Sequence, residues 1–234
     1  MASPKPLIID YAAVARTTLF KDLPLAALED ICSQAQTRMV KRNGFFFAQG
    51  DPIDRQYLLL AGRVKITQLS ADGQQTLLRA IGPYHLFGVV ILAQMEAYPV
   101  SAEAQEDCTA LGWTRSTLID LIHRYPDLAL NAFQIMAAHT QEFQERFRQM
   151  ATERVEHRLA HTLLRLANQA GKKLPEGVLI DLPLTRQDLG EMAGTTQYTV
   201  SRLLTQWESQ GLIIAGREHI VIRFPHGLVT IAEG

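Results

Sequence analysis

The sequence of 234 residues contains only two cysteines, and they lie far apart at Cys32 and Cys108. Neither belongs to a Cys-x-x-Cys pair, so the sequence predicts neither a disulfide framework nor a thiolate metal cluster. No apolar run approaches the roughly 20 residues that a membrane-spanning helix needs. The N-terminal segment MASPKPLIIDY also lacks the apolar core of a signal peptide. We therefore expect a cytoplasmic protein with two buried, unpaired thiols.

An excess of charge of either sign is also missing. The chain has 23 Lys and Arg against 24 Asp and Glu, which gives a formal net charge of -1. From Thr152 onward there are nine basic and nine acidic residues. Composition therefore gives no argument for a nucleic-acid partner, and any DNA-binding face must be a local arrangement. The length and the 47% hydrophobic content fit a soluble globular chain with two small domains.

The front half of the chain has the pattern of an antiparallel β domain. Between Met39 and Thr114, short apolar runs such as RVKITQL and QTLLRAI are separated by turn residues such as Asp-Gly and Gly-Pro. Several short strands with this spacing predict a sandwich or barrel. Before them, Leu25, Leu28 and Ile31 recur at helical spacing. We expect a helical lead-in followed by a β domain.

A long helix is predicted from about Asp127 to Met150. Apolar residues on it recur at alternating steps of three and four, the repeat by which one helix packs along another. The members of this stripe are Phe133, Met136, Thr140, Phe143, Phe147 and Met150. The opposite face is densely charged, which favours a helical partner over one-sided burial. We expect a parallel homodimer, while packing against the helix's own domain is the alternative.

The back half contains two amphipathic segments joined by a short polar turn. RVEHRLAHTLLRLANQAG predicts a helix that ends at Gly171, and VLIDLPL predicts a short strand. Thr185 and Asp188 then have the spacing of a capping box, which predicts the start of the next helix. Ala193 and Gly194 form the turn, and another helix is expected from about Thr195 or Thr196. Two helices joined in this way predict a helix-turn-helix.

The last of these helices carries polar side chains at its N-terminal end, where a recognition helix enters the major groove. Its predicted buried stripe is Val200, Leu203, Leu204 and Trp207, which leaves Gln197, Tyr198, Ser201 and Arg202 facing outward. Gln can bond adenine bidentately and Arg can bond guanine. Thr185, Arg186 and Thr196 are suited to phosphate contacts. GLIIAGREHIVIRF predicts a hairpin wing around Gly216, with Arg217 and His219 near the DNA backbone.

With these motifs, LTRQDLGEMAGTTQYTVSRLL resembles the winged helix-turn-helix of the cyclic-AMP receptor protein and fumarate-nitrate regulator (CRP/FNR) superfamily of bacterial transcription regulators. GDPIDRQYLLLAGRVKITQLSADGQQTLLRAIGP is similar to that family's cyclic-nucleotide-binding β-roll. The resemblance runs from about Phe20 to Phe224 and implies an α+β fold. It places a jelly-roll sensor in residues 1–126, a dimerisation helix in 127–152 and a winged helix-turn-helix in 153–234. It also implies a homodimer on pseudo-palindromic DNA, with RNA polymerase as a further partner and no enzymatic activity.

The resemblance implies a candidate effector pocket in the β-roll, but the chain departs from the cyclic-AMP-binding pattern there. Val89 follows Phe87-Gly88 where that branch has Glu, and Val100 precedes Ser101 where it has Arg. A buried phosphate would lose its charge-assisted bidentate partner. An ungapped count from HTLLRLA places the adenine-contacting pair on Phe143 and Gln144. We therefore expect no cyclic AMP in the family's usual mode.

Other cofactors stay open at this point. His85 occupies a turn where the family usually has Asp, and Tyr84 replaces a turn glycine, so His85 is a candidate axial ligand for haem. The alternatives are a small acid, a nucleotide bound differently, or no ligand. His157 and His161 have a spacing that can grip zinc, but no third ligand is in view, so no metal site is predicted. The N-terminal cysteines of the iron–sulfur branch are absent, so no such cluster is expected.

The leading interpretation is a homodimeric, sequence-specific DNA-binding regulator whose sensor domain controls the pose of its recognition helices. The family resemblance also implies that Tyr198 stands where many relatives have Glu, which changes the expected half-site. The alternative is a ligand-binding or haem-binding sensor that regulates a protein partner without specific DNA binding. A cupin-like metalloenzyme is set aside, because His85 is the only histidine before His123.

Overall fold

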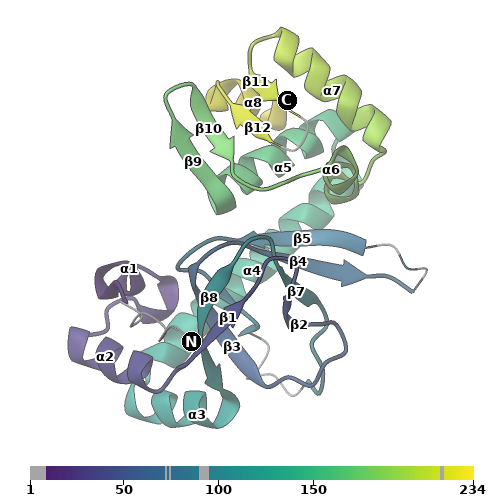
Figure 1. Ribbon diagram of the computed structural model, residues 1–234. Coiled ribbons are helices and arrows are strands. Elements are labelled where there is room, and N and C mark those ends of the chain that lie inside the picture. Colours follow the sequence, from purple (N-terminus) through teal and green to yellow (C-terminus); the bar gives the residue numbers. More distant parts are fainter. Residues whose placement is uncertain (1–8, 72, 74, 90–94, 217–218) are drawn as a thin grey trace.

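The computed structural model describes residues 9–71, 73, 75–89, 95–216 and 219–234. Two lobes are joined by a long helix, with the N-terminal lobe built mainly of strands and the C-terminal lobe mainly of helices (Figure 1). This confirms the predicted α+β class and the order of a β domain, a long helix and a helix-turn-helix with a small sheet. No helix among the described residues is long and apolar enough to cross a membrane.

Where it is described, the N-terminal lobe contains two four-stranded antiparallel sheets. The first has the order β1-β8-β3-β6 and the second the order β2-β7-β4-β5. Their strands are β1 (Gln36–Val40), β2 (Phe45–Phe47), β3 (Arg55–Ala61), β4 (Val64–Leu69), β5 (Gln75–Ile81), β6 (Leu86–Phe87), β7 (Ser101–Ala104) and β8 (Cys108–Thr114). The β4–β5 hairpin corresponds to the RVKITQL and QTLLRAI runs, so the alternating pattern located this hairpin correctly.

Aromatic side chains fill the space between the two sheets. Phe46, Phe47, Tyr57, Phe87 and Tyr98 are all buried there. Phe47 stacks on Tyr98 with ring centroids 3.8 Å apart, and Phe46 meets Tyr57 edge-on. Rings of this size bury the most apolar area per residue, so they dominate the packing of a small β domain. Both cysteines are buried and unpaired, as expected, and burial raises the pKa of the Cys32 thiol to about 11.

Short helices cover the outer face of the first sheet. They are α1 (Tyr11–Ala15), a 3₁₀ turn (Thr18–Phe20), α2 (Leu25–Ser33) and α3 (Arg115–Arg124). Trp113 on β8 is buried beneath them and its Nε1 donates to the carbonyl oxygen of Ile31 at 2.8 Å. Of the predicted helical face, Leu28 and Ile31 are buried but Leu25 is 58% exposed, because it is the first residue of α2. Helix α3 was not predicted.

Helix α4 (Asp127–Thr152) leaves the sensor lobe and leads towards the C-terminal lobe. Its start is fixed by Asn131, whose buried amide donates to the carbonyl oxygens of Leu19 and Lys21. The predicted stripe lies on an uncovered face of this single chain. Its members Phe133, Met136, Thr140, Phe143, Phe147 and Met150, called here the α4 stripe, are all exposed. Most of the stripe therefore does not pack against its own domain, although Met136 also lines a cavity of the sensor lobe.

The described residues of the C-terminal lobe form four helices and a four-stranded sheet of order β11-β12-β10-β9. Its elements are α5 (Val155–Ala170), β9 (Gly171–Leu174), β10 (Gly177–Ile180), α6 (Arg186–Ala193), α7 (Gln197–Ser209), β11 (Ile213–Ala215), β12 (Ile220–Ile222) and α8 (Pro225–Glu233). The hairpin wing around Gly216 is confirmed, while β9 and α8 were not predicted. Gly171 ends α5 as expected, but its φ of -77 is not left-handed. Glycine is required there because a Cβ would lie 2.0 Å from the Ala167 carbonyl oxygen.

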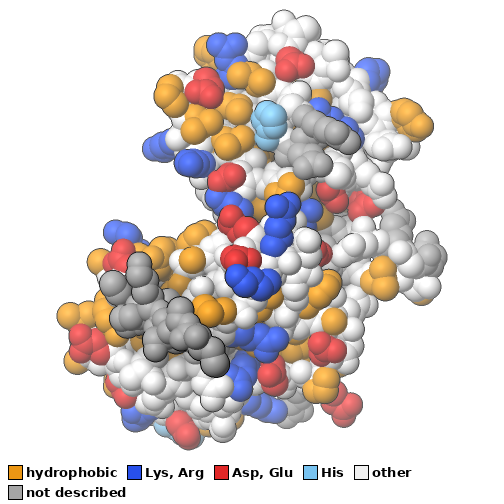
Figure 2. Space-filling model, viewed as in Figure 1, with side chains coloured by type: hydrophobic (Ala, Val, Ile, Leu, Met, Phe, Trp, Pro, Cys, Tyr) orange, Lys and Arg blue, Asp and Glu red, His pale blue; other side chains and the backbone are white. Residues whose placement is uncertain are grey.

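The two lobes share a core through strand β5. Leu77 and Ala80 of β5 are buried together with Leu159 and Leu163 of α5, inside the hydrophobic cluster of the C-terminal lobe. Arg63 adds an ion pair to Asp181 across the same junction. Figure 2 shows basic and acidic side chains next to one another where the lobes meet. Strand β5 therefore packs directly on the helices of the C-terminal lobe.

Candidate nucleic-acid interface

Helix α6 begins with the predicted capping box. The Thr185 hydroxyl accepts from the Asp188 backbone N–H at 3.0 Å, and the Asp188 carboxylate accepts from the Thr185 N–H at 2.8 Å. The helix ends at Gly194, which adopts the left-handed conformation with φ of 63. An L-residue with a side chain pays a steric cost in that conformation, so glycine suits this turn. The sequence therefore fixes both ends of α6 locally.

Helix α7 starts immediately after the turn and presents two distinct faces. Thr196 caps it by accepting from the Thr199 N–H at 3.3 Å, which places the start within one or two residues of the prediction. Val200, Leu203, Leu204 and Trp207 are all buried, as expected. Gln197, Tyr198, Ser201 and Arg202 are all exposed, and Tyr198 is 79% exposed. The side chains with base-reading chemistry thus project from one end of α7, as a recognition helix requires.

The residues expected to contact phosphates lie at the starts of α6 and α7 and on the wing. Thr185 and Thr196 are exposed and both act as helix N-caps. Arg186 instead turns towards the wing, where its Nη2 donates to the Gly216 carbonyl oxygen at 3.1 Å. Burial lowers the pKa of its guanidinium. His219 is exposed on the wing, while Arg217 lies outside the described residues.

Further residues that shape this candidate interface were not among those expected from the sequence. Thr205 and Gln206 are exposed on α7, one turn beyond Ser201 and Arg202, and helical periodicity could have identified them. Gly190 lets the turn pack closely on α6, since a Cβ there would lie 2.8 Å from the Thr195 carbonyl oxygen. A glycine inside a helical pattern was the available signal.

Arg158 of α5 connects the turn of the helix-turn-helix to the end of α4. Its Nε and Nη2 donate to the carbonyl oxygens of Ala193 and Gly194 at 2.8 and 3.0 Å. Its Nη1 donates to the carbonyl oxygen of Glu153 at 2.7 Å. Nothing in its spacing distinguished Arg158 from other surface arginines of an amphipathic helix. The contact ties the DNA-binding turn to the junction between the two long helices.

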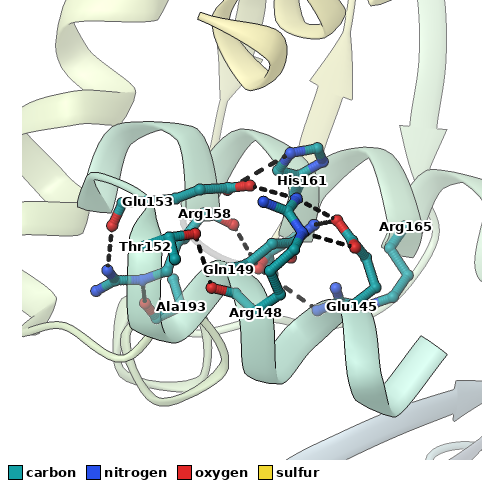
Figure 3. A network of polar contacts seen from close by, with 10 residues as sticks. Glu145, Arg148, Gln149, Thr152, Glu153, Arg158, His161, Arg165 and Ala193 are labelled. Atoms are coloured by element: carbon teal, nitrogen blue, oxygen red, sulfur yellow. Dashed lines mark hydrogen bonds and ion pairs between the residues drawn. The ribbon is translucent and has the colours of Figure 1, made fainter. Parts of the chain in front are cut away.

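The same junction carries a network of ion pairs (Figure 3). Arg148 donates to Glu145 at 2.6 Å and to Glu153 at 2.9 Å. These bonds from Arg148 hold the pKa of Glu145 at about 2. His161 of α5 lies 3.6 Å from Glu153, so one histidine of the His157–His161 spacing noted in the sequence faces a carboxylate between α4 and α5. The described residues contain no group of three or more side chains able to hold a metal ion.

The sensor lobe contains a cavity of about 180 Å³ between its sheets and α4, called here the roll cavity. Phe87, Gly88, Val89 and Val100, which belong to the candidate effector pocket, line it. Most of the other lining residues are apolar, and the charged or titratable ones are Arg79, Tyr98 and His139. The cavity therefore offers mainly apolar contacts, with polar groups from β5 and α4.

The remaining candidate pocket residues lie elsewhere. Ser101 accepts from the Gln49 backbone N–H at 2.9 Å. His85 is exposed and its Nδ1 donates to the Pro83 carbonyl oxygen at 3.0 Å. Phe143 and Gln144 are exposed farther along α4, and the α4 residues that line the roll cavity are Met136 and His139. Tyr84, noted as a replacement for glycine, adopts the left-handed conformation with φ of 63.

Two family models match separate parts of the chain. A cyclic nucleotide-binding domain matches residues 37–125, and a Crp-like helix-turn-helix domain matches residues 157–231. The first match covers the β-roll and α3, and the second covers α5 through most of α8. The unmatched interval between them contains α4. Both matches agree with the elements described above.

Curated relatives and solved structures with the same organisation extend this similarity. The nitrogen fixation regulation protein FixK of Azorhizobium caulinodans is 31% identical over 74% of this chain and 68% of its own length. The cyclic AMP receptor protein of Thermus thermophilus is 29% identical over 92% of this chain and 97% of its own length. The structure of FixK2 from Bradyrhizobium japonicum superposes with a TM-score of 0.72 at 23% identity, covering 84% of this chain and 96% of that chain.

Proposed function

Because the chain belongs to the CRP/FNR family of transcription regulators, which are DNA-binding proteins and not enzymes, we propose that it binds a pseudo-palindromic DNA site as a homodimer. The observation that carries this proposal is the exposure of Gln197, Ser201 and Arg202 at the leading end of a helix whose opposite face is buried. Gln and Arg side chains read adenine and guanine edges in the major groove, while Thr185 and Thr196 contact phosphates.

The α4 stripe supports the dimer. Phe133, Phe143 and Phe147 are each at least 70% exposed, and they lie on one side of a helix of 26 residues. Exposed aromatic side chains in a row of this length mark an interaction surface. The spacing of three and four residues matches a second α4 packed alongside the first. A two-fold dimer formed in this way carries two copies of α7 for two half-sites about one helical turn apart.

Regulation is proposed to act through the relative pose of the lobes. Strand β5 lines the roll cavity through Arg79 and Ile81 and also contributes Leu77 and Ala80 to the core of the C-terminal lobe. A ligand that occupies the cavity displaces this strand, and the C-terminal lobe follows. Two dimer arrangements with unequal affinity for DNA give the required coupling.

The proposed effector is not cyclic AMP bound in the usual mode of the family. Val89 and Val100 line the roll cavity, and neither offers a hydrogen bond to a ribose hydroxyl or a cyclic phosphate. Haem is not part of the proposal, because His85 does not line this cavity. RNA polymerase is proposed as the further partner, and the cytoplasm as the compartment, because both follow from regulation of transcription on duplex DNA.

Selection from a pool of random duplexes at fixed salt tests this function. The expected result is enrichment of one two-fold symmetric motif with half-site centres 10–10.5 base pairs apart. Affinity for the selected duplex should fall steeply as salt rises, since phosphate contacts release counterions. A pool that shows no preferred motif, or an affinity independent of salt, would refute the proposal.

A further inference from the structure

Three arginines from three different elements converge on one carboxylate where the lobes meet. Arg79 of β5 donates through Nη2 to Glu142 Oε2 at 3.0 Å. Arg146, one turn along α4, lies 3.3 Å from Glu142 Oε1, and Arg165 of α5 lies 3.8 Å from the same oxygen. Gln169 donates to this oxygen at 3.5 Å. We call these five residues the junction cluster.

The charges of the junction cluster do not balance. Its three guanidinium groups face a single carboxylate, and their side chains are only 30%, 27% and 16% exposed. The nearby Glu145 is engaged by Arg148 through two bonds, and His139 accepts from Arg79, so it is neutral there. Burial and the neighbouring arginines lower the pKa of Arg165 to about 10. Like charges held together away from water destabilise the fold unless a counter-charge joins them.

Several polar atoms of the junction cluster also lack partners. The Nε atoms of Arg79, Arg146 and Arg165 are shielded from solvent and have no hydrogen-bond acceptor. The Oε1 atom of Gln169 has no donor. Buried polar groups of folded proteins are hydrogen-bonded in the great majority of cases. Four such atoms within one cluster indicate that the arrangement is completed by something outside this chain.

A cavity lies directly against the junction cluster. It has a volume of about 570 Å³, and all five cluster residues line it together with Asn168 at the rim. A neighbouring cavity of about 250 Å³ shares Arg79, Glu142 and Gln169 and extends over apolar side chains such as Ile81, Leu86 and Ile135. Ligand sites usually occupy about 300–1,000 Å³. The space suits a small organic molecule with one charged end and one less polar end.

We propose that the junction cluster binds a small organic phosphate, with its phosphate group between Arg79, Arg146 and Arg165 and the rest of the molecule in the neighbouring cavity. Planar guanidinium groups match the oxygens of phosphate in paired hydrogen bonds. Because the three arginines come from the sensor lobe, α4 and the C-terminal lobe, a bound phosphate fixes the angle between the lobes. This site adjoins the roll cavity, with which it shares Arg79, and it does not depend on the proposed DNA target.

Thermal unfolding of the full chain with added anions tests the site directly. The probes are inorganic pyrophosphate, glycerol 3-phosphate and succinate, each compared with potassium chloride at the same ionic strength. The two phosphates should raise the midpoint by about 3–6 °C at ten times their dissociation constant. Succinate should raise it much less. A response to succinate without a response to the phosphates would contradict the proposed ligand class.

Two variants locate the response. Arg165→Gln removes one guanidinium of the cluster, and Asn168→Glu places a competing carboxylate at the exposed rim while leaving the cluster unchanged. Both should abolish the rise, while Arg115→Gln, at an exposed arginine on α3, should keep it. If Arg165→Gln fails to fold, the response of Asn168→Glu to the phosphates still tests whether they bind at the junction cluster. A wild-type protein that ignores both phosphates, or an Asn168→Glu variant that responds like the wild type, would overturn the inference.

Discussion

Arg158 and Ala193 are joined by a hydrogen bond of 2.8 Å from the guanidinium Nε to the backbone carbonyl. Arg158 belongs to α5, and Ala193 is the last residue of α6. Since the same guanidinium also binds the carbonyl oxygen of Glu153, where α4 ends, a single side chain spans from the proposed dimerisation helix to the turn before α7. The orientation of the recognition helix is therefore tied to α4 through Arg158.

Replacing Arg158 with Met should destabilise the protein by about 1.5–3 kcal/mol, because the carbonyl oxygens of Ala193 and Gly194 lose their charged donor. Urea unfolding at 25 °C measures this loss. Arg115→Met, at an exposed arginine on α3, is the matched control and should change stability by less than about 0.5 kcal/mol. Equal stabilities of the two variants would show that the Arg158 contacts contribute little.

Gly190→Ala should lower the free energy of unfolding by about 1–2 kcal/mol. The new Cβ would meet the Thr195 carbonyl oxygen at 2.8 Å and the Gln197 nitrogen at 3.3 Å, and the overpacking outweighs the better helix propensity of alanine. Gly82→Ala is the control, since its nearest contact would be an ordinary 3.5 Å. A Gly190→Ala variant as stable as the control would mean that α6 and α7 need no close approach.

The double variant Phe143→Glu, Phe147→Glu should dissociate the proposed dimer. Both rings are 70% exposed on α4, and buried carboxylates at a helix seam would repel each other. Sedimentation velocity at micromolar concentration should show a dimer for the wild type and a monomer for the variant, with an affinity loss on the order of 100-fold. Leu25→Glu changes another exposed apolar residue, 58% exposed on α2, and should leave the dimer intact. A variant that still sediments as a dimer would place the interface elsewhere.

His139 should make stability depend on pH. Its Nε2 faces the Arg79 guanidinium, and burial together with Arg79 lowers its pKa, against a smaller opposing effect of Glu142. Because the folded-state pKa is below the ordinary value of 6.5, the stabilisation is complete above pH 6.5. It is lost as pH falls from 6.5 through the folded-state pKa, since the unfolded chain binds the proton first.

Unfolding free energies at pH 7.5, 6.5 and 5.5 measure this dependence. The decrease between pH 6.5 and 5.5 should be larger for the wild type than for His139→Gln. His226→Gln, at an exposed histidine of α8, should retain the wild-type decrease. If the unfolding free energies of the wild type and His139→Gln fell equally with pH, His139 would not be the source of the pH dependence.

Features set by neighbouring residues could be predicted from the sequence. The capping box of Thr185 and Asp188, the hairpin of β4 and β5, and the buried stripe of α7 all depend on short repeats and turn chemistry. The exposure of Gln197 and Arg202 follows from the same helical period. Local patterns of this kind therefore located most of the proposed DNA interface.

Features set by contacts between distant residues could not be predicted in this way. Arg79 meets Glu142 across 63 positions of the chain, and Arg158 meets Ala193 across 35. An ungapped count from a distant motif pointed to Phe143 and Gln144, but the α4 residues that line the roll cavity are Met136 and His139. Such a count does not determine which turn of a long helix reaches a cavity. No spacing rule in the sequence identifies such pairs. The Arg158 contacts and the junction cluster can therefore be recognised only in the folded structure.

The central claim is that Gln197, Ser201 and Arg202 enter the major groove, and fluorescence anisotropy with Arg202→Ala tests it most directly. The partners are the selected duplex and duplexes in which each half-site base pair is changed in turn. The account predicts a loss of about 1–3 kcal/mol on the selected duplex and relaxed preference at one base pair of each half-site. Arg115→Ala should bind as the wild type does. An unchanged affinity and base preference for Arg202→Ala would contradict the account.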